Sequence, residues 1–239
     1  MDTARRIVER ARAVLVDFDG PLARLFPGGG WLEVTDRVKA EAVAAGGPAL
    51  GELLAAERDH VQCLRIVGEH APELLDRLEA FTSHLERDSA TEVSPRPGAL
   101  DLVDRTLERG AVLAVVTNNT PEIVATVLDR ARPGASDRLQ VVGRSRGRVD
   151  DLKPQPDLLG RALGLLGARA EEAVFLGDSV TDVQAGAAAG VPVVGVAEDS
   201  ARRRELRSAG AAAVVEGVAD LLPPPQEKTA GDSHTVEDG

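Results

Sequence analysis

The sequence predicts an α/β protein with an open, parallel, Rossmann-like sheet, helices on both faces of that sheet, and an inserted all-helical cap domain. Short runs of apolar, mostly β-branched residues recur along the chain, at 13–16, 111–116, 139–142, 173–176, 191–196 and 212–215. Several runs are almost wholly apolar, which is typical of parallel strands buried on both faces. Helical patterns separate most of these runs, and this alternation indicates an open α/β sheet.

Four helices are predicted between the strands, at 97–108, 121–131, 156–166 and 182–189, and a further helix precedes the first strand. Thr120 is expected to be the N-cap of the second of these helices, with Pro121 at its first position. The last of the four is expected to end at Gly190, two residues before Pro192.

The region between the first and second strands breaks the alternation. Leu74, Leu78, Phe81 and Leu85 follow the spacing of one face of an amphipathic helix, apolar residues between 53 and 67 suggest a second helix, and 34–43 a third. Turn-rich segments at 25–30 and 94–98 resemble hinges. The alternative is that these helices pack directly on the sheet.

These patterns divide the chain into three parts. Residues 1–25 and 94–222 form the predicted α/β core, and residues 26–93 form the helical cap. Residues 223–239 contain almost no apolar side chains and are predicted to be a disordered tail.

Composition argues against several classes of protein. The chain has 239 residues, a net charge of −11, a pI near 4.9 and only 2% aromatic residues, which disfavours nucleic acid as a partner. No apolar run approaches the roughly 20 residues that span a bilayer, so no membrane association is expected. The single cysteine, Cys63, excludes an internal disulfide and fits a cytoplasmic protein. The histidines share no metal-ligand spacing, which disfavours zinc.

Polar residues gather where the predicted strands end, which is where open α/β sheets bind their ligands. The residues at the ends of the first four strands or in the loops after them are, in chain order, Asp17, Asp19, Thr117, Asn118, Lys153, Asp178 and Asp182. Converging carboxylates make an oxygen site suited to Mg²⁺. A carboxylate can also attack phosphorus, and a lysine with a hydroxyl can offset the charge of phosphoryl oxygens.

The blocks DFDGPL, VVTNN, LKPQPD and GDSVTDVQAGAAAGVP occur in this order and resemble the four motifs of the haloacid dehalogenase superfamily. The resemblance covers about 14–196 and is to the subgroup with a helical cap after the first motif, typified by phosphoglycolate phosphatase-like enzymes. It implies a Mg²⁺-dependent phosphatase that hydrolyses a small phosphorylated metabolite through an aspartyl-phosphate intermediate.

The resemblance also implies a role for each motif residue. Asp17 is then the nucleophile, and Asp19 protonates the leaving alcohol and deprotonates the attacking water. Thr117 and Asn118 bind the phosphoryl group, and Lys153 neutralises both that group and Asp17. Superfamily members that cleave carbon–halogen bonds lack the second aspartate, so Asp19 favours phosphoryl transfer.

Magnesium ligation follows the same resemblance. Asp17 and Asp178 are implied as direct ligands, Asp19 as a ligand through its backbone carbonyl, and Asp182 as an indirect or water-mediated ligand. Taken alone, Asp182 is equally consistent with a helix cap. The arrangement requires Asp178 and Lys153 to lie within about 10 Å of the first acidic pair, because they must share one ion.

Several alternatives stay open from the sequence. Pro21 stands where related phosphatases have Thr or Val and removes a backbone donor; it either weakens turnover or only stiffens the loop. Arg144, Arg146 and Arg148 are interpreted as a plain surface loop, and attraction of an anionic substrate is the alternative. A phosphomutase of the same superfamily and a non-catalytic binding or regulatory protein are the competing functions. A monomer or homodimer is expected.

Overall fold

The computed structural model describes residues 3–223 and shows a six-stranded parallel sheet in the order β3-β2-β1-β4-β5-β6. The predicted fold class is therefore confirmed. The strands are β1 (Ala13–Val16), β2 (Val112–Val116), β3 (Gln140–Val142), β4 (Ala173–Gly177), β5 (Val193–Val196) and β6 (Ala213–Val215). Each lies within two residues of its predicted bounds at either end.

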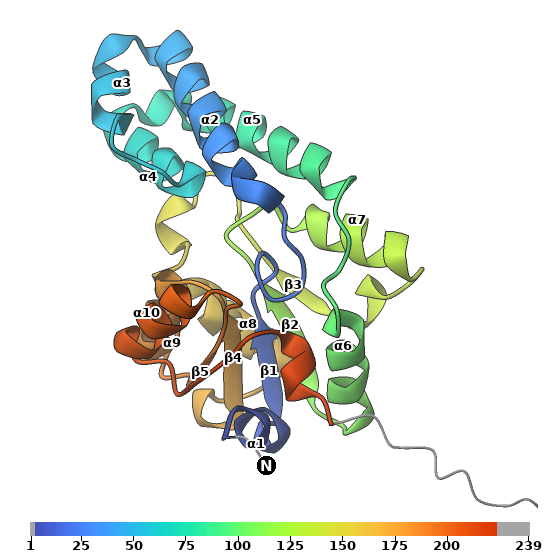
Figure 1. The fold of residues 1–239 in the computed structure, drawn as a ribbon. Coiled ribbons are helices and arrows are strands. Elements are labelled where there is room, and N and C mark those ends of the chain that lie inside the picture. Colours follow the sequence, from blue (N-terminus) through green and yellow to red (C-terminus); the bar gives the residue numbers. More distant parts are fainter. Residues whose placement is uncertain (1–2, 224–239) are drawn as a thin grey trace, which may run out of the picture.

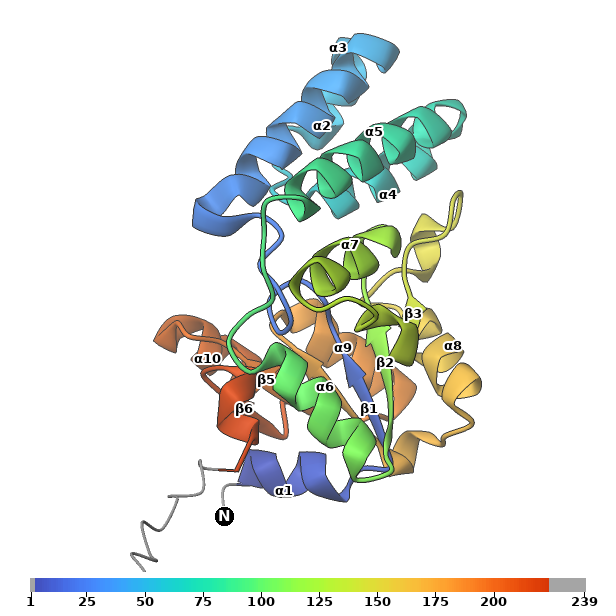
Figure 2. The same cartoon turned by 90° about the vertical axis from the view of Figure 1, so that its right-hand side faces the viewer.

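Helices cover both faces of the sheet (Figures 1 and 2). α8 to α10 pack on one face, and α1 and α6 on the other. Right-handed crossovers produce this division, because the chain runs outward from β1 in one direction and then returns to build the other half of the sheet. The helices are α1 (Thr3–Arg10), α6 (Ala99–Glu108), α7 (Glu122–Ala131), α8 (Asp157–Leu166), α9 (Val180–Ala189) and α10 (Ser200–Ala209).

The start of α7 differs from the prediction. Pro121, and not Thr120, is the residue that precedes the helix, and no side chain caps it. The Thr120 hydroxyl bonds the carboxylate of Glu122 instead, and its backbone N–H donates to the carboxylate of Glu86 at 2.8 Å. Tertiary contact has therefore replaced the local cap.

The predicted helical region contains four helices, where the apolar pattern had suggested three. They are α2 (Gly30–Gly46), α3 (Pro48–Leu54), α4 (His60–His70) and α5 (Pro72–Ala90), preceded by a 3₁₀ turn at Pro27–Gly29. The segment predicted as one helix across 53–67 is split because Asp59 caps α4. Its carboxylate accepts the N–H groups of Val61 at 2.7 Å and Gln62 at 3.4 Å.

These four helices pack mainly on one another and lie across the carboxyl ends of the strands, not on a face of the sheet (Figures 1 and 2). The alternative that they pack directly on the sheet is therefore wrong. Contacts with the core include those of α5 with α7 and of α4 with the 3₁₀ turn at Val149–Asp151. The domain boundaries at 26 and 93 stay a prediction, and the predicted tail lies almost wholly outside the described residues.

The central strands lie in the core, and all four residues of β1 are fully buried.

Cys63 of α4 is also buried, and burial raises the pKa of its thiol to about 12. This thiol is packed as an apolar side chain. Within the described residues, no helix is both long enough and apolar enough to cross a membrane.

Candidate active site

Four strand ends meet under the helical insertion, at the point where the strand order reverses around β1. β1 lies between β2 and β4, and the Asp17 amide donates to the carbonyl of Leu176 at 2.8 Å, which extends the sheet by one residue. A cavity of about 660 Å³ opens above these ends, and it is lined by all seven of the side chains singled out in the sequence.

Lys153 is the electrostatic centre of the site. Its side chain is 2% exposed, and its Nζ lies 2.9 Å from Asp17 Oδ2 and 2.8 Å from Asp182 Oδ1. The same ammonium donates to the Val116 carbonyl at 3.3 Å and lies 5.4 Å from the centre of the Phe175 ring. Burial alone would lower the pKa of Lys153, but the two carboxylates raise it, so this lysine is a permanent cation.

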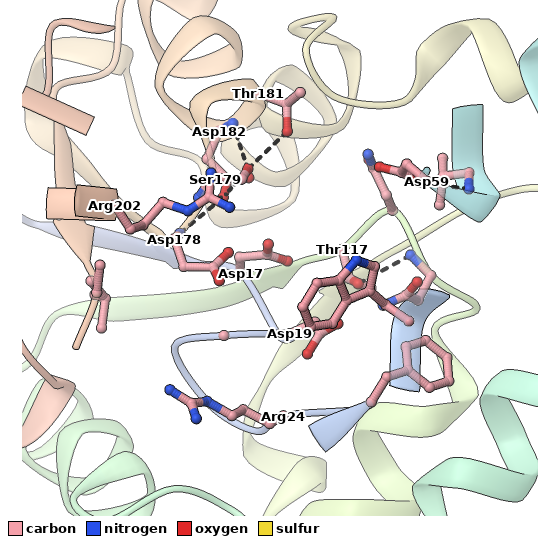
Figure 3. Close-up of a pocket in the computed structure, with 18 of the residues that line it drawn as sticks. Asp17, Asp19, Arg24, Asp59, Thr117, Asp178, Ser179, Thr181, Asp182 and Arg202 are labelled. Carbon is pink, nitrogen blue, oxygen red and sulfur yellow. Dashed lines mark hydrogen bonds between the residues drawn. The ribbon is translucent and has the colours of Figure 1, made fainter. Parts of the chain in front are cut away.

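Three carboxylates form one cluster. Asp17, Asp178 and Asp182 each offer an oxygen atom, and these atoms lie within 4.8 Å of one another. Figure 3 shows the carboxylates of Asp17 and Asp178 side by side. Burial raises the pKa of Asp17 to about 8, although Lys153 lowers it, and the pKa of Asp178 is raised well above its usual value by burial and then by Asp182 and Asp17. The single lysine does not neutralise this group of acids.

Two glycines make room for the cluster. A Cβ atom on Gly20 would lie 2.2 Å from Cγ of Asp178, and Gly20 has a φ of +102° that side chains disfavour. A Cβ atom on Gly177 would lie 2.4 Å from Cβ of Asp182. Both carboxylates can therefore approach Asp17 only because the facing backbone positions carry no side chain.

Asp182 both caps a helix and joins the cluster. Ser179 is the N-cap of α9; its hydroxyl accepts the Asp182 amide at 3.1 Å, and Asp182 Oδ2 accepts the Ser179 amide at 3.0 Å. The other oxygen, Oδ1, faces Lys153. The helix-cap interpretation is therefore correct for one oxygen of the carboxylate. Indirect ligation of Mg²⁺ by Asp182 stays a prediction.

Asp19 is placed differently from the other acids. Its Oδ1 accepts the amide of Leu25 at 2.8 Å, across the loop that leads into the insertion, and its side chain is not part of the three-carboxylate cluster. Burial raises the pKa of Asp19 above its usual value. The separation of its carboxyl group from the cluster leaves that group free to act on another part of a bound molecule, while ligation through its carbonyl stays a prediction.

Thr117 and Asn118 come from the loop after β2, and both reach the cavity. The hydroxyl of Thr117, which is fully buried, accepts the Asn119 amide at 3.1 Å. Asn118 bonds Lys153 at both ends of its side chain: Oδ1 accepts the lysine amide at 2.8 Å, and Nδ2 donates to the lysine carbonyl at 3.0 Å. Asn118 therefore fixes the lysine segment as well as lining the cavity.

The interpretation of Arg144 as part of a plain surface loop is wrong. Its side chain is 3% exposed and donates to both carboxylate oxygens of Glu86, each at 2.8 Å. The sequence does carry a signal for this: Glu79 and Glu86 are seven residues apart, which puts both on the apolar face of α5 beside Leu78 and Leu85. Arg146 and Arg148, by contrast, are exposed.

The residues present fit a magnesium ion. The donor set is three carboxylates, which are the hard oxygen ligands that Mg²⁺ prefers. Apart from its ion pair with Lys153, the buried Asp182 Oδ1 has no hydrogen-bond partner among the described residues. A cation between these oxygens would offset the repulsion that raises the pKa of Asp178.

Comparison with known proteins identifies the family. Residues 11–190 match the haloacid dehalogenase-like hydrolases. The chain belongs to this family. It is 33% identical to the phosphoglycolate phosphatase of Rhodospirillum rubrum over 231 residues, covering 88% of this chain and 89% of that protein. The resemblance stated from the motifs is confirmed, and so is the enzyme class, a phosphatase-type hydrolase.

Solved structures of this hydrolase family's fold match nearly the whole chain. CbbY from Rhodobacter sphaeroides, in complex with phosphate, has a TM-score of 0.64 and 24% identity, covering 88% of this chain and 96% of CbbY. A phosphonoacetaldehyde hydrolase-like protein from Oleispira antarctica has a TM-score of 0.65 and 20% identity, covering 89% of this chain and 90% of that one. At these identities the structures establish the shared fold alone.

Proposed function

We propose that this hydrolase is a Mg²⁺-dependent phosphatase that removes the phosphoryl group from a small metabolite through an aspartyl-phosphate on Asp17. The observation that carries the proposal is the position of Lys153, whose Nζ lies between Asp17 at 2.9 Å and Asp182 at 2.8 Å beside a three-carboxylate cluster. One lysine beside three carboxylates leaves a net negative charge, which a bound divalent cation would offset, and the lysine can then face the negative phosphoryl group.

The first half-reaction transfers the phosphoryl group to the protein. A carboxylate oxygen of Asp17 forms a bond to phosphorus as the bond from phosphorus to the leaving oxygen breaks, and Asp19 gives its proton to that oxygen. Lys153 holds the Asp17 carboxylate in place, and Thr117 follows the neighbouring strand and lines the cavity. Hydrogen bonds and charges already in position lower the barrier because they need no reorganisation.

The second half-reaction returns the enzyme to its starting state. Asp19, now a carboxylate, takes a proton from water, and the resulting hydroxide attacks phosphorus. The bond from phosphorus to Asp17 breaks, which releases inorganic phosphate and regenerates both acids. Asp17, Asp178 and Asp182 would hold the Mg²⁺ ion, which supplies charge neutralisation for the phosphoryl oxygens.

A phosphate-release assay tests the proposal. The full chain is incubated with Mg²⁺ and a panel of phosphoglycolate, sugar phosphates, nucleoside monophosphates, amino-acid phosphates and an aryl phosphate. We expect release of inorganic phosphate from at least one small phosphomonoester, and none from Asp17→Asn. If no panel member and no aryl phosphate is hydrolysed with Mg²⁺ present, the proposal is wrong.

The same assay decides between the competing functions. A phosphomutase would yield an isomerised sugar phosphate without net phosphate release, because substrate and not water would intercept the intermediate. A binding or regulatory protein would retain ligand affinity and release nothing. The cytoplasmic location, the monomeric or homodimeric state and the absence of nucleic-acid and membrane partners stay predictions from the sequence.

A further inference from the structure

The helical insertion touches the core at a point that bears on Lys153. Arg65 of α4 donates from Nε to the carbonyl of Val149 at 3.1 Å and from Nη2 to the carbonyl of Lys153 at 3.0 Å. Nη2 also donates to the carbonyl of Leu152. One guanidinium from the insertion therefore binds three backbone carbonyls of the segment that carries the lysine. Only a planar, multi-donor group can satisfy such a set, so Lys is a poor substitute for Arg there.

A second contact bears on the loop after β2. Glu86 of α5 is fully buried; it accepts the Thr120 amide at 2.8 Å and two bonds from Arg144. Arg144 in turn donates from Nη1 to the Asn118 carbonyl at 3.1 Å, and its own amide donates to the Asn119 carbonyl at 3.0 Å. The turn at 118–120 is therefore held by a carboxylate of the insertion and by the arginine paired to it.

The two contacts meet at the reacting centre. Arg65 fixes the carbonyl of Lys153, Glu86 and Arg144 fix the backbone of 118–120, and the Asn118 side chain joins the two segments through its bonds to the Lys153 backbone. A contact that only attached the insertion to the core could end anywhere on the core surface. Both of these reach the backbone of residues that line the cavity: Arg65 does so directly at Lys153, and Glu86 does so through Arg144, which binds the carbonyls of Asn118 and Asn119.

We propose that Arg65 and Glu86 are positioning residues for phosphoryl transfer, through which the seated insertion sets the geometry of Lys153 and of the 118–120 turn. This inference rests on the proposed phosphatase function. The insertion then has a second role besides covering the cavity: the phosphate-binding part of the core is complete only when α4 and α5 are in place. A displacement of about 1 Å at such groups can lower turnover about 100-fold.

The chain offers a matched control for this proposal. Arg146 and Asp76 also join the core to α5, at 2.6 Å, but their side chains are 74% and 60% exposed and neither residue lines the cavity. If attachment of the insertion were all that mattered, removing this pair would act in the same way as removing Arg65 or Glu86. Exposed ion pairs contribute little to stability, so Asp76→Asn should leave turnover unchanged.

The experiment compares Arg65→Gln, Arg65→Lys and Glu86→Gln with Asp76→Asn and the unsubstituted chain. For Arg65→Gln and Glu86→Gln we expect kcat to fall about 10- to 100-fold with KM changed less than about threefold, because alignment and not ground-state binding is lost. The kcat of Arg65→Lys should lie between that of Arg65→Gln and that of the unsubstituted chain. Hydrogen exchange should rise at the Thr120 amide in Glu86→Gln and at the Lys153 amide in Arg65→Gln, with no change in Asp76→Asn.

Glu86→Gln leaves the buried Arg144 without its charge partner and is at risk of unfolding. The double variant Glu86→Gln/Arg144→Met removes both charges. It tests the same contact without leaving an unpaired charge in the interior. Unchanged kcat in folded Arg65→Gln and in the double variant would overturn the proposal, and so would a rise in KM alone. If the unsubstituted chain itself releases no phosphate, the proposed function has failed instead, which keeps the two outcomes distinct.

Discussion

The two ends of the cavity are built in different ways. At the strand end, Asp17, Lys153 and Asp182 are all at least 93% buried, and each makes several charged or hydrogen-bonded contacts. At the insertion end, Trp31 is 48% exposed, and the guanidinium of Arg58 makes no hydrogen bond or ion pair with any other residue in 3–223. The first end is fixed before a ligand arrives, and the second has unused surface to offer one.

The open end still has some order. The hydroxyl of Thr35, which is 1% exposed, lies 2.7 Å from the carbonyl of Trp31 and 3.3 Å from that of Arg58. One buried hydroxyl therefore links the backbone carbonyls of an aromatic residue and a cationic residue, which come from separate segments of the insertion. The strand end is therefore preorganised, and under the proposed function the exposed rim at the insertion end would contact the rest of the substrate.

The largest effect is expected at the strand end. Asp17→Asn should lower kcat by at least about 10⁴-fold, because the amide cannot serve as the nucleophile and the covalent route is lost. Turnover of an aryl phosphate with Mg²⁺ measures this, with a thermal melt to verify folding. Retention of the unsubstituted rate would show that the strand end does not carry the chemistry.

Removing divalent cations should abolish turnover, and adding Mg²⁺ should restore it. The ion should also stabilise the folded chain, by about 2.7 kcal/mol when it is present at 100 times its dissociation constant. The shift in melting temperature with Mg²⁺ is the measurement, and Asp178→Asn should reduce the shift because one ligand of the cluster is lost. An equal shift in that variant would argue against the cluster as the metal site.

Gly20→Ala tests the strand end alone, because the added methyl group would crowd the carboxylate cluster. The new Cβ would overlap the Asp178 carboxyl carbon at 2.2 Å, so kcat should fall about 100-fold as the carboxylate is displaced. Gly110→Ala is the control, since Gly110 also has a positive φ, of +78°, but has open space around it. Both variants should lose about 1–2 kcal/mol of stability from left-handed backbone, and only Gly20→Ala should lose turnover.

The smallest effect is expected at the open end. Trp31→Ala and Arg58→Ala should raise KM about tenfold for the preferred substrate, equal to about 1.4 kcal/mol, with kcat nearly unchanged because these contacts are made before and during reaction alike. Leu165→Ala is the control, because this side chain is 61% exposed and lies outside the cavity. A fall in kcat without a change in KM would mean that the two ends are not separable.

Most of the sheet and the acidic residues at its strand ends could be predicted, because the sequence signals for them are local. The strands were found within two residues because buried parallel strands are continuous apolar runs, and the acids were found because they follow those runs directly. The boundary between α3 and α4 was missed because Leu53 to Val67 keeps helical apolar spacing across Asp59, whose capping role overrides the periodicity. Thr120 was misassigned because its amide bonds Glu86, a residue 34 positions away.

The fold class, the strand ends and the residue types that gather there follow from the amino-acid sequence, because they depend on the hydrophobic pattern and on the order of residues along the chain. Three facts became visible in the folded chain: Arg144 is a buried partner of Glu86, Arg65 reaches the Lys153 backbone, and Gly20 gives Asp178 its space. These facts depend on which surfaces meet when the insertion lies across the strand ends. The sequence does not show whether a charged residue or a glycine faces water or a carboxylate, because the packing of the folded chain decides this.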